Sequence, residues 1–169
     1  ASGTTAVTGA ISGGDGTDTL GMVAADIVTA DNDLALSALV TGFESLAVIG
    51  STGAQAINLT NMGITNNIVV STSAADGDLT LSNLVNGGTV TVTGALTGVT
   101  VSNALFALAA ATTDSVNLVM AAANGFDGGT FTAANVETIN LNATDTSTAA
   151  GIVAMTVDVT ASSATALNI

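Results

Sequence analysis

The sequence predicts an all-β protein that winds as a β-solenoid of the parallel β-roll type, with irregular loops and one or two short helices. Apolar pairs recur every 11 residues along part of the chain, which indicates an internal repeat. Gly, Asn and Asp occupy most of the segments between the pairs and Pro is absent, so these residues make the turns. Four Phe, with no Trp or Tyr, leave a narrow core of Val, Leu, Ile and Ala. An antiparallel β-sandwich, whose strands also recur about every 8 to 12 residues, is the alternative fold.

Strands are expected where two apolar residues flank one other residue, because alternation places both side chains on one face of a strand. The pairs spaced 11 residues apart are Leu46/Val48, Ile57/Leu59, Ile68/Val70, Leu79/Leu81 and Val90/Val92. A further pair, Val99/Val101, follows after nine residues. Unevenly spaced pairs, which indicate longer loops, are Val116/Leu118, Ile139/Leu141, Val157/Val159 and Leu167/Ile169. Each strand and turn would bury its apolar face against the next, as the coils of a solenoid do.

Two short helices are predicted to interrupt the repeat. Three polar residues, Asp31 to Asp33, precede an apolar group that ends before Gly42, the pattern of an N-capped helix with a glycine stop. The apolar residues of this group are Leu34, Leu36, Leu39 and Val40. The second helical candidate is the segment Ala104 to Ala111. Neither terminus of the chain shows a polar cap.

The charge of the chain points to a bound cation. It has 13 Asp and Glu but no Lys, Arg or His, and a formal net charge of −13, so no ion pair between side chains can form. Each carboxylate must therefore find water, a backbone N–H, a hydroxyl group or a cation. We expect a metal-dependent protein, with calcium as the cofactor.

The same composition excludes several functions. Nucleic acids and anionic membranes attract cationic side chains, which are absent here. The longest apolar run, Ala104 to Ala111, is much shorter than the roughly 20 residues that span a bilayer. Without His, Cys or Tyr, catalysis could rest only on paired carboxylates that cleave a glycoside or peptide bond. We therefore expect neither membrane insertion nor an enzyme.

One motif carries a specific metal-binding signal. The segment Gly13-Gly14-Asp15-Gly16-Thr17-Asp18-Thr19-Leu20-Gly21 fits the nonapeptide pattern G-G-x-G-x-D-x-U-x. It resembles the calcium-binding RTX proteins. The resemblance implies a tight glycine turn, carboxylate ligands at Asp15 and Asp18, and a Leu20 side chain that points into the core. In that family an ion usually lies between two successive turns, whereas this chain has a single full copy.

Other acidic residues are weaker candidate ligands. The pairs Asp31/Asp33 and Asp76/Asp78 have a spacing that lets two carboxylates converge on one hard cation, although a helix cap and a turn explain them equally well. Two segments, Asp127-Gly128-Gly129 and Asn86-Gly87-Gly88, are fragments of the nonapeptide motif. The alternative interpretation of each is a plain turn. Glu44 and Glu137 could bind calcium or accept backbone N–H bonds where strands begin.

A second resemblance covers more of the chain. The segments 42–48 and 135–141 share an apolar residue, Glu, Ser or Thr, and then an alternating strand. With the nonapeptide and the texture rich in Thr, Ala, Asn, Val and Gly, they resemble surface-layer proteins and other large proteins exported by type I secretion in Gram-negative bacteria. This resemblance implies a secreted, calcium-stabilised subunit that assembles on the cell surface with other copies of itself, and cell-surface polysaccharide is a further candidate partner.

The expected organisation is a single β-rich domain over residues 1–169. It comprises a calcium-loop and short-helix region (1–42), regular repeats (43–104) and irregular repeats (105–169). The chain starts at Ala1 without a signal peptide and stops within an expected strand at Ile169, so we expect a processed product or a segment of a longer protein. The absence of Cys excludes disulfides.

Two binding functions remain as alternatives. A repeat of a calcium-dependent adhesin would share the acidic, calcium-stabilised coils. An ice-binding solenoid would use stacked rows of hydroxyl groups, and the candidate rows are Thr80/Ser82, Thr91/Thr93 and Thr100/Ser102. The first expected function, however, is a structural subunit whose unpaired strands join neighbouring copies. Removing residues 160–169 is then expected to abolish assembly.

Overall fold

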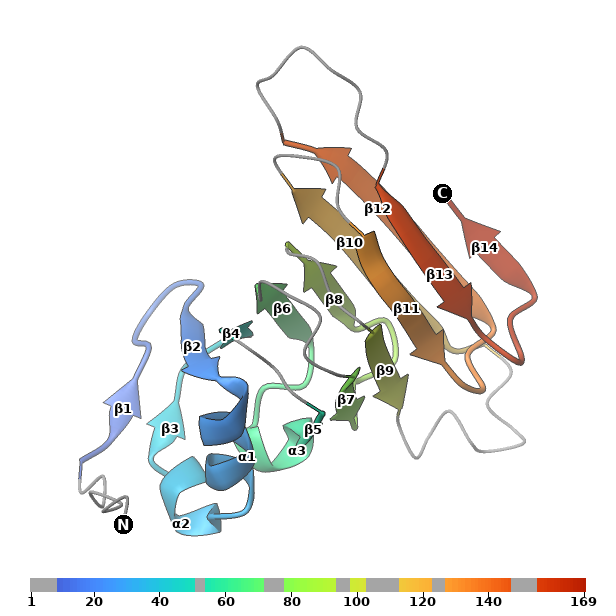
Figure 1. Cartoon of the computed structure of the whole chain (residues 1–169). Helices are drawn as coiled ribbons and strands as arrows, with labels where there is room; N and C mark the ends of the chain where they lie inside the picture. Colours follow the sequence, from blue (N-terminus) through green and yellow to red (C-terminus); the bar gives the residue numbers. More distant parts are fainter. Residues whose placement is uncertain are drawn as a thin grey trace.

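The computed structural model describes residues 9–50, 54–71, 78–93, 98–102, 113–122, 127–146 and 155–169. The chain coils through two parallel β-sheets, and its strands follow one another in chain order along the stack (Figure 1). All strand pairs among the described residues are parallel. The β-solenoid prediction is therefore confirmed, and the antiparallel sandwich is wrong.

The two large sheets take alternate strands of the chain. The seven-stranded sheet contains β2 (Thr19–Val23), β4 (Ser45–Ile49), β6 (Asn67–Ser71), β8 (Thr89–Val92), β10 (Ser115–Ala122), β12 (Thr138–Asp145) and β14 (Ala166–Asn168). The five-stranded sheet contains β5 (Gln55–Asn58), β7 (Asp78–Ser82), β9 (Gly98–Ser102), β11 (Asp127–Ala133) and β13 (Thr156–Thr160). A separate short pair joins β1 (Ile11–Ser12) to β3 (Val40–Thr41).

The 11-residue repeat corresponds to half a coil. Leu46 lies beside Ile68, which lies beside Val90, at intervals of 22 residues within the seven-stranded sheet. Of the intervening pairs, Leu79/Leu81 lies in β7 of the other sheet, whereas Ile57 lies in β5 and Leu59 begins a short helix. Two 11-residue units thus make one turn of the solenoid, because each turn passes through both sheets.

The core lies between the two sheets and is filled by the inward-facing residues of the predicted pairs. Leu46, Val48, Ile68 and Val70 are fully buried or nearly so. Burial of each such side chain contributes about 1.5 to 3 kcal/mol. The five-stranded sheet adds a strand that the pairs did not predict, β11, which contributes the buried residue Phe131. The narrow apolar interior expected from composition is thus present.

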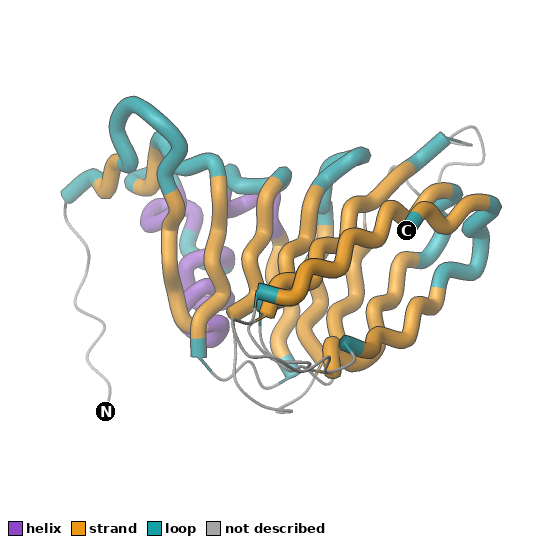
Figure 2. Tube along the Cα trace, turned by 90° about the horizontal axis from the view of Figure 1, so that it is seen from above, coloured by secondary structure: helices purple, strands orange, loops and turns teal. Residues whose placement is uncertain are grey.

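A helix closes the core at its N-terminal end. Helix α1 (Ala24–Asp31) packs on β5, in place of a strand of the five-stranded sheet. Its buried side chains are Ala24, Ile27 and Ala30, whose spacing of three residues places them on one helix face. Figure 2 shows the helices at the N-terminal side of the stack. Beside this helix, β2 remains an edge strand of the seven-stranded sheet, and its Val23 is 41% exposed.

The helix predicted after Asp33 is present but shorter than expected. Helix α2 spans Leu34–Ser37 and is followed by β3. Val40, which was expected to belong to the helix, lies in β3 and pairs with β1 instead. Helix α3 (Leu59–Met62) was not predicted; Asn58 caps its start and Gly63, with φ of 69°, ends it. The candidate helix Ala104 to Ala111 lies outside the described residues.

The side chains of the C-terminal coil are less buried than those of the middle coils. Strands β13 and β14 contain no fully buried residue. Leu167 is 51% exposed and Ile169 is 93% exposed, although alternation places both in line with core residues of the preceding strands. The seven-stranded sheet therefore ends, among the described residues, in a largely apolar edge.

Candidate functional site

The nonapeptide forms a tight turn that leads into β2. Gly14 and Gly16 have φ angles of 91° and 125°, which favour glycine. Gly13 lies so close to the neighbouring chain segment that a Cβ atom there would be 2.0 Å from the carbonyl oxygen of Gly42. Leu20, at the other end of the motif, packs against the core. The predicted glycine turn and the inward direction of Leu20 are confirmed.

Asp18 and Glu44 form a hydrogen-bonded corner where β2 and β4 begin. The Asp18 N–H donates to Glu44 Oε2 at 2.7 Å. In return, the Asp18 carbonyl accepts bonds from the N–H groups of Glu44 and Ser45, each at 3.1 Å. Glu44 therefore accepts a backbone N–H at a strand start, one of its two expected roles. The carboxylate of Asp18 keeps a buried oxygen, Oδ2, without a hydrogen-bond partner among the described residues, which fits a cation ligand.

A second corner repeats this arrangement where β10 and β12 begin. The Asp114 N–H donates to Glu137 Oε2 at 2.9 Å. The Asp114 carbonyl accepts from the N–H groups of Glu137 and Thr138, at 3.2 and 2.9 Å. Asn86, from the turn before β8, donates its side-chain amide to Asp114 Oδ1 at 2.9 Å. Asp114 was not predicted from the sequence. At Asp114 and Glu137, as at Asp18 and Glu44, the acidic residue is followed by Ser or Thr and then by an apolar residue.

The remaining predicted ligands do not gather into a described cluster. Asp15 is exposed in the glycine turn. Asp31 is the last residue of α1, and Asp33 accepts the Ala35 N–H at 3.1 Å, as a helix cap does. The described part of the chain contains no group of three or more acidic side chains placed to share an ion.

Three more predicted ligands have side chains outside the described part of the structure. Asp78 is the first residue of β7 and Asp127 the first of β11, but both side chains, and the whole of Asp76, lie outside what the structure describes. The fragment after Asp127 is not a turn: it begins β11, where the register shifts before Thr130 and Gly129 has φ of 63°. Such a bulge needs an extra residue in one strand.

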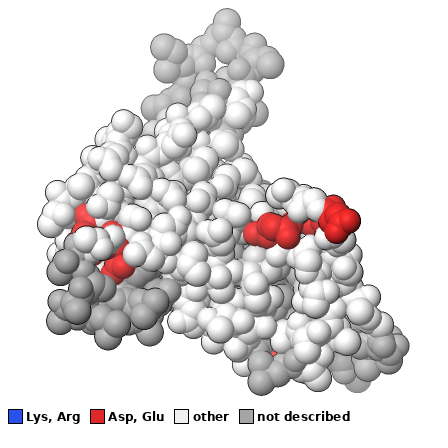
Figure 3. Space-filling model, turned by 180° about the vertical axis from the view of Figure 1, so that it is seen from behind, with Lys and Arg blue, Asp and Glu red and all other residues white. Residues whose placement is uncertain are grey.

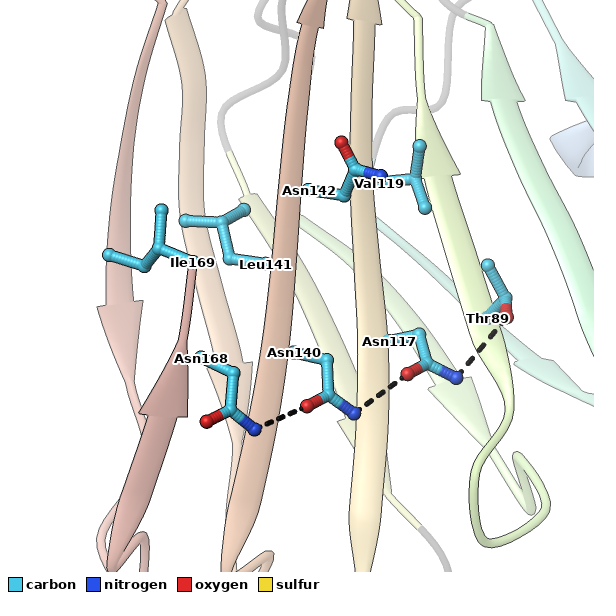
Figure 4. A pocket seen from close by; sticks show the side chains of 8 residues that line it. All are labelled: Thr89, Asn117, Val119, Asn140, Leu141, Asn142, Asn168 and Ile169. Atoms are coloured by element: carbon cyan, nitrogen blue, oxygen red, sulfur yellow. Dashed lines mark hydrogen bonds between the residues drawn. The ribbon is translucent and has the colours of Figure 1, made fainter.

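An asparagine ladder crosses the outer face of the seven-stranded sheet (Figure 4). Asn168 donates to Asn140 at 2.7 Å, Asn140 to Asn117 at 2.9 Å, and Asn117 to Thr89 at 3.5 Å. A shallow groove of about 400 Å³ runs beside it. The sequence signal for the ladder is an Asn between two apolar residues at 117, 140 and 168, which was overlooked; the same pattern at Asn58 lies in β5 of the other sheet.

The hydroxyl rows proposed for an ice-binding face are not continuous. Thr80 lies beside Thr100 and Ser82 beside Ser102, in β7 and β9. Thr91 instead lies in β8 of the other sheet, between Val69 and Val119. The three-row prediction is wrong because successive 11-residue units fall in different sheets.

The charge on the molecule is of one sign. Acidic side chains gather in two separate places on the face shown in Figure 3, with no basic side chain beside them.

No helix within the described ranges combines the length and apolar character that crossing a membrane demands. Comparisons with protein-family models, with curated proteins and with solved structures find no match for this chain.

Proposed function

We propose that this protein is a non-catalytic structural subunit that is secreted and assembles, with calcium, into a layer or filament on a cell surface. The observation that carries the proposal is that the seven-stranded sheet has two exposed edges among the described residues, β2 and β14. Each edge strand carries an exposed apolar side chain, Val23 on β2 and Leu167 on β14.

The chemistry of β14 suits the addition of another strand. Ala166 donates its N–H to Glu137 O in the preceding coil. Because successive residues of a strand direct their backbone groups to opposite sides, the N–H and C=O of Leu167 face the open edge. An exposed edge with apolar side chains is a template for strand pairing.

The proposed occupant is β2 of a second copy, the strand at the other edge of the same sheet. One column of aligned residues crosses the whole sheet, from Thr19 at β2 to Asn168 at β14. Pairing of β14 with β2 would continue this column, with a hydroxyl group placed beside the last amide of the ladder. Such a head-to-tail contact joins two different surfaces, so it produces an open array.

Calcium has two roles in this proposal. A net charge of −13 makes copies repel one another at low ionic strength. Calcium bound at carboxylates such as that of Asp18 would lower this repulsion and stabilise the coils. We expect dissociation constants of about 10⁻⁴ to 10⁻³ M, the range of extracellular calcium modules.

The edge is tested by Leu167→Pro, which removes the outward N–H but no bond to β12. Particle length is measured by electron microscopy and sedimentation, with calcium present. We expect polymers from the unchanged chain, folded monomers from Leu167→Pro, and polymers from the matched control Leu167→Val, which keeps the N–H. Removal of residues 160–169 is a coarser test because it uncovers the edge of β12.

Two results would contradict the proposal. Polymers of normal length from Leu167→Pro would show that β14 is not the contact. An unchanged chain that stays monomeric at all concentrations would favour the adhesin repeat instead, and circular dichroism of each variant would establish that it is folded.

A further inference from the structure

We propose that the corner formed by Asp114, Glu137 and Asn86 is a second binding site for a divalent cation, and that the cation is calcium. The site joins three successive strands of the seven-stranded sheet, because Asn86 precedes β8, Asp114 precedes β10 and Glu137 precedes β12. The inference rests on the calcium dependence in the proposed function but not on assembly.

The first evidence is a buried carboxylate oxygen without a partner. Asp114 is only 4% exposed and is the one polar or charged residue in the described core. Its Oδ1 accepts the Asn86 amide at 2.9 Å, whereas its Oδ2 has no hydrogen-bond partner in the described part of the molecule. Burial of an unpaired carboxylate is unfavourable, and the chain contains no Lys, Arg or His that could pair with it.

The second evidence is the carboxylate on the neighbouring strand. Glu137 Oε2 accepts the Asp114 N–H at 2.9 Å, so its carboxylate lies against the residue that carries the unpaired oxygen. The corner thus carries two negative charges, and a cation bound at Asp114 would offset the repulsion between them. Asn86 Oδ1, which accepts the Ser115 N–H at 2.9 Å, adds an amide oxygen to the same corner.

The third evidence is that the arrangement occurs twice. At both Asp18 and Asp114, the Asp N–H donates to a Glu of the next coil, and the Asp carbonyl accepts two N–H groups from the start of that coil's strand. In both corners the same atom, Oδ2 of the Asp, is buried without a described partner. The second corner has no glycine nonapeptide, so its cation site follows from the corner itself.

The available donors select the kind of ion. The corner offers carboxylate and amide oxygens, and the chain has no His or Cys to supply nitrogen or thiolate ligands. Oxygen ligands favour hard cations, and calcium accepts the irregular sets that magnesium, with its strict octahedron, does not. Water and backbone carbonyls would complete the coordination.

The test counts calcium ions by isothermal titration calorimetry on the full chain and on Asp114→Asn. The matched control is Asp158→Asn, which changes an exposed Asp on β13. We expect Asp114→Asn to bind one ion fewer than the unchanged chain and to lose part of the calcium-dependent rise in melting temperature. Asp158→Asn is expected to keep both. An unchanged number of ions in Asp114→Asn would overturn the inference.

A measurement on the unchanged chain covers the case in which Asp114→Asn does not fold. With ¹³C-labelled Asp carboxylates, the Asp114 resonance is expected to shift and saturate as calcium is added. No shift at Asp114, while other carboxylates respond, would overturn the inference. Repeating the titration on Leu167→Pro separates the two proposals, since loss of polymer in that variant should leave the ion count unchanged.

Discussion

At Gly13, one chain segment packs directly against the backbone of another. The position tolerates only hydrogen at Cα, because a Cβ atom would lie 2.0 Å from Gly42 O and 2.7 Å from the Asp18 Cβ. The glycines of the nonapeptide therefore act through close approach as well as through backbone freedom. This contact holds the loop over the corner that carries Asp18.

The residue-scale prediction compares two glycines. Gly13→Ala is expected to lower the free energy of unfolding by about 1 to 3 kcal/mol, because the added methyl group forces the two segments apart. Gly9→Ala, with open space around its Cα, is expected to change it by less than about 0.5 kcal/mol. Urea unfolding followed by circular dichroism measures both, and equal stability of the two variants would contradict the close packing.

Asp18 could be predicted as a candidate ligand from the sequence, whereas Asp114 could not. Asp18 was predicted because all its motif residues lie within nine positions of the chain. Asp114 was not, because its partner Glu137 lies 23 residues away and its partner Asn86 lies 28 residues away. No local spacing encodes a contact that depends on the length of intervening coils.

Helix α1 is the element that most changes the picture of the molecule. It takes the place of a strand beside β5, and buries Ile27 completely. Its start lacks a side-chain cap, since Val23 occupies the N-cap position. Tertiary burial rather than capping therefore stabilises it, which explains why a search for capping residues predicted the helix after Asp33 but not α1.

The element-scale prediction concerns this helix. Ile27→Ala is expected to destabilise the protein by about 2 to 5 kcal/mol, because it leaves a cavity between α1 and β5. Thr29→Ala, on the exposed side of the same helix, is expected to cost less than about 0.5 kcal/mol. Thermal unfolding followed by circular dichroism distinguishes them. If the two variants melted together, α1 would not be a structural cap.

On the scale of the whole molecule, an acidic chain must be held together without internal ion pairs. If calcium binds as proposed, each occupied site would stabilise the folded state by about 2.7 kcal/mol when calcium is at 100 times its dissociation constant. Each coil also stacks on the next through strand pairing and side-chain ladders, and calcium at a corner would add to these contacts.

The whole-molecule prediction is that a chelator lowers the melting temperature and shortens the polymers. In chelator, raising sodium chloride from about 0.01 to 0.15 M is expected to restore part of the loss, because it reduces the Debye length from about 30 to 8 Å. Magnesium added in place of calcium is the control and is expected to restore less. A melting temperature and a polymer length that ignore the chelator would contradict calcium dependence.

The class of fold and the chemistry available to this protein follow from its amino-acid sequence. Alternating apolar pairs and glycine turns encode strands locally, and the constant spacing together with the small core residues favours the solenoid over the sandwich. Composition likewise determines that no side-chain cation exists. Only the tertiary structure shows which half-coils share a sheet and where the asparagine ladder forms. It also shows that the threonine rows fall in two different sheets. It also decided that Asp114 lies buried against Glu137, because burial depends on how distant coils stack.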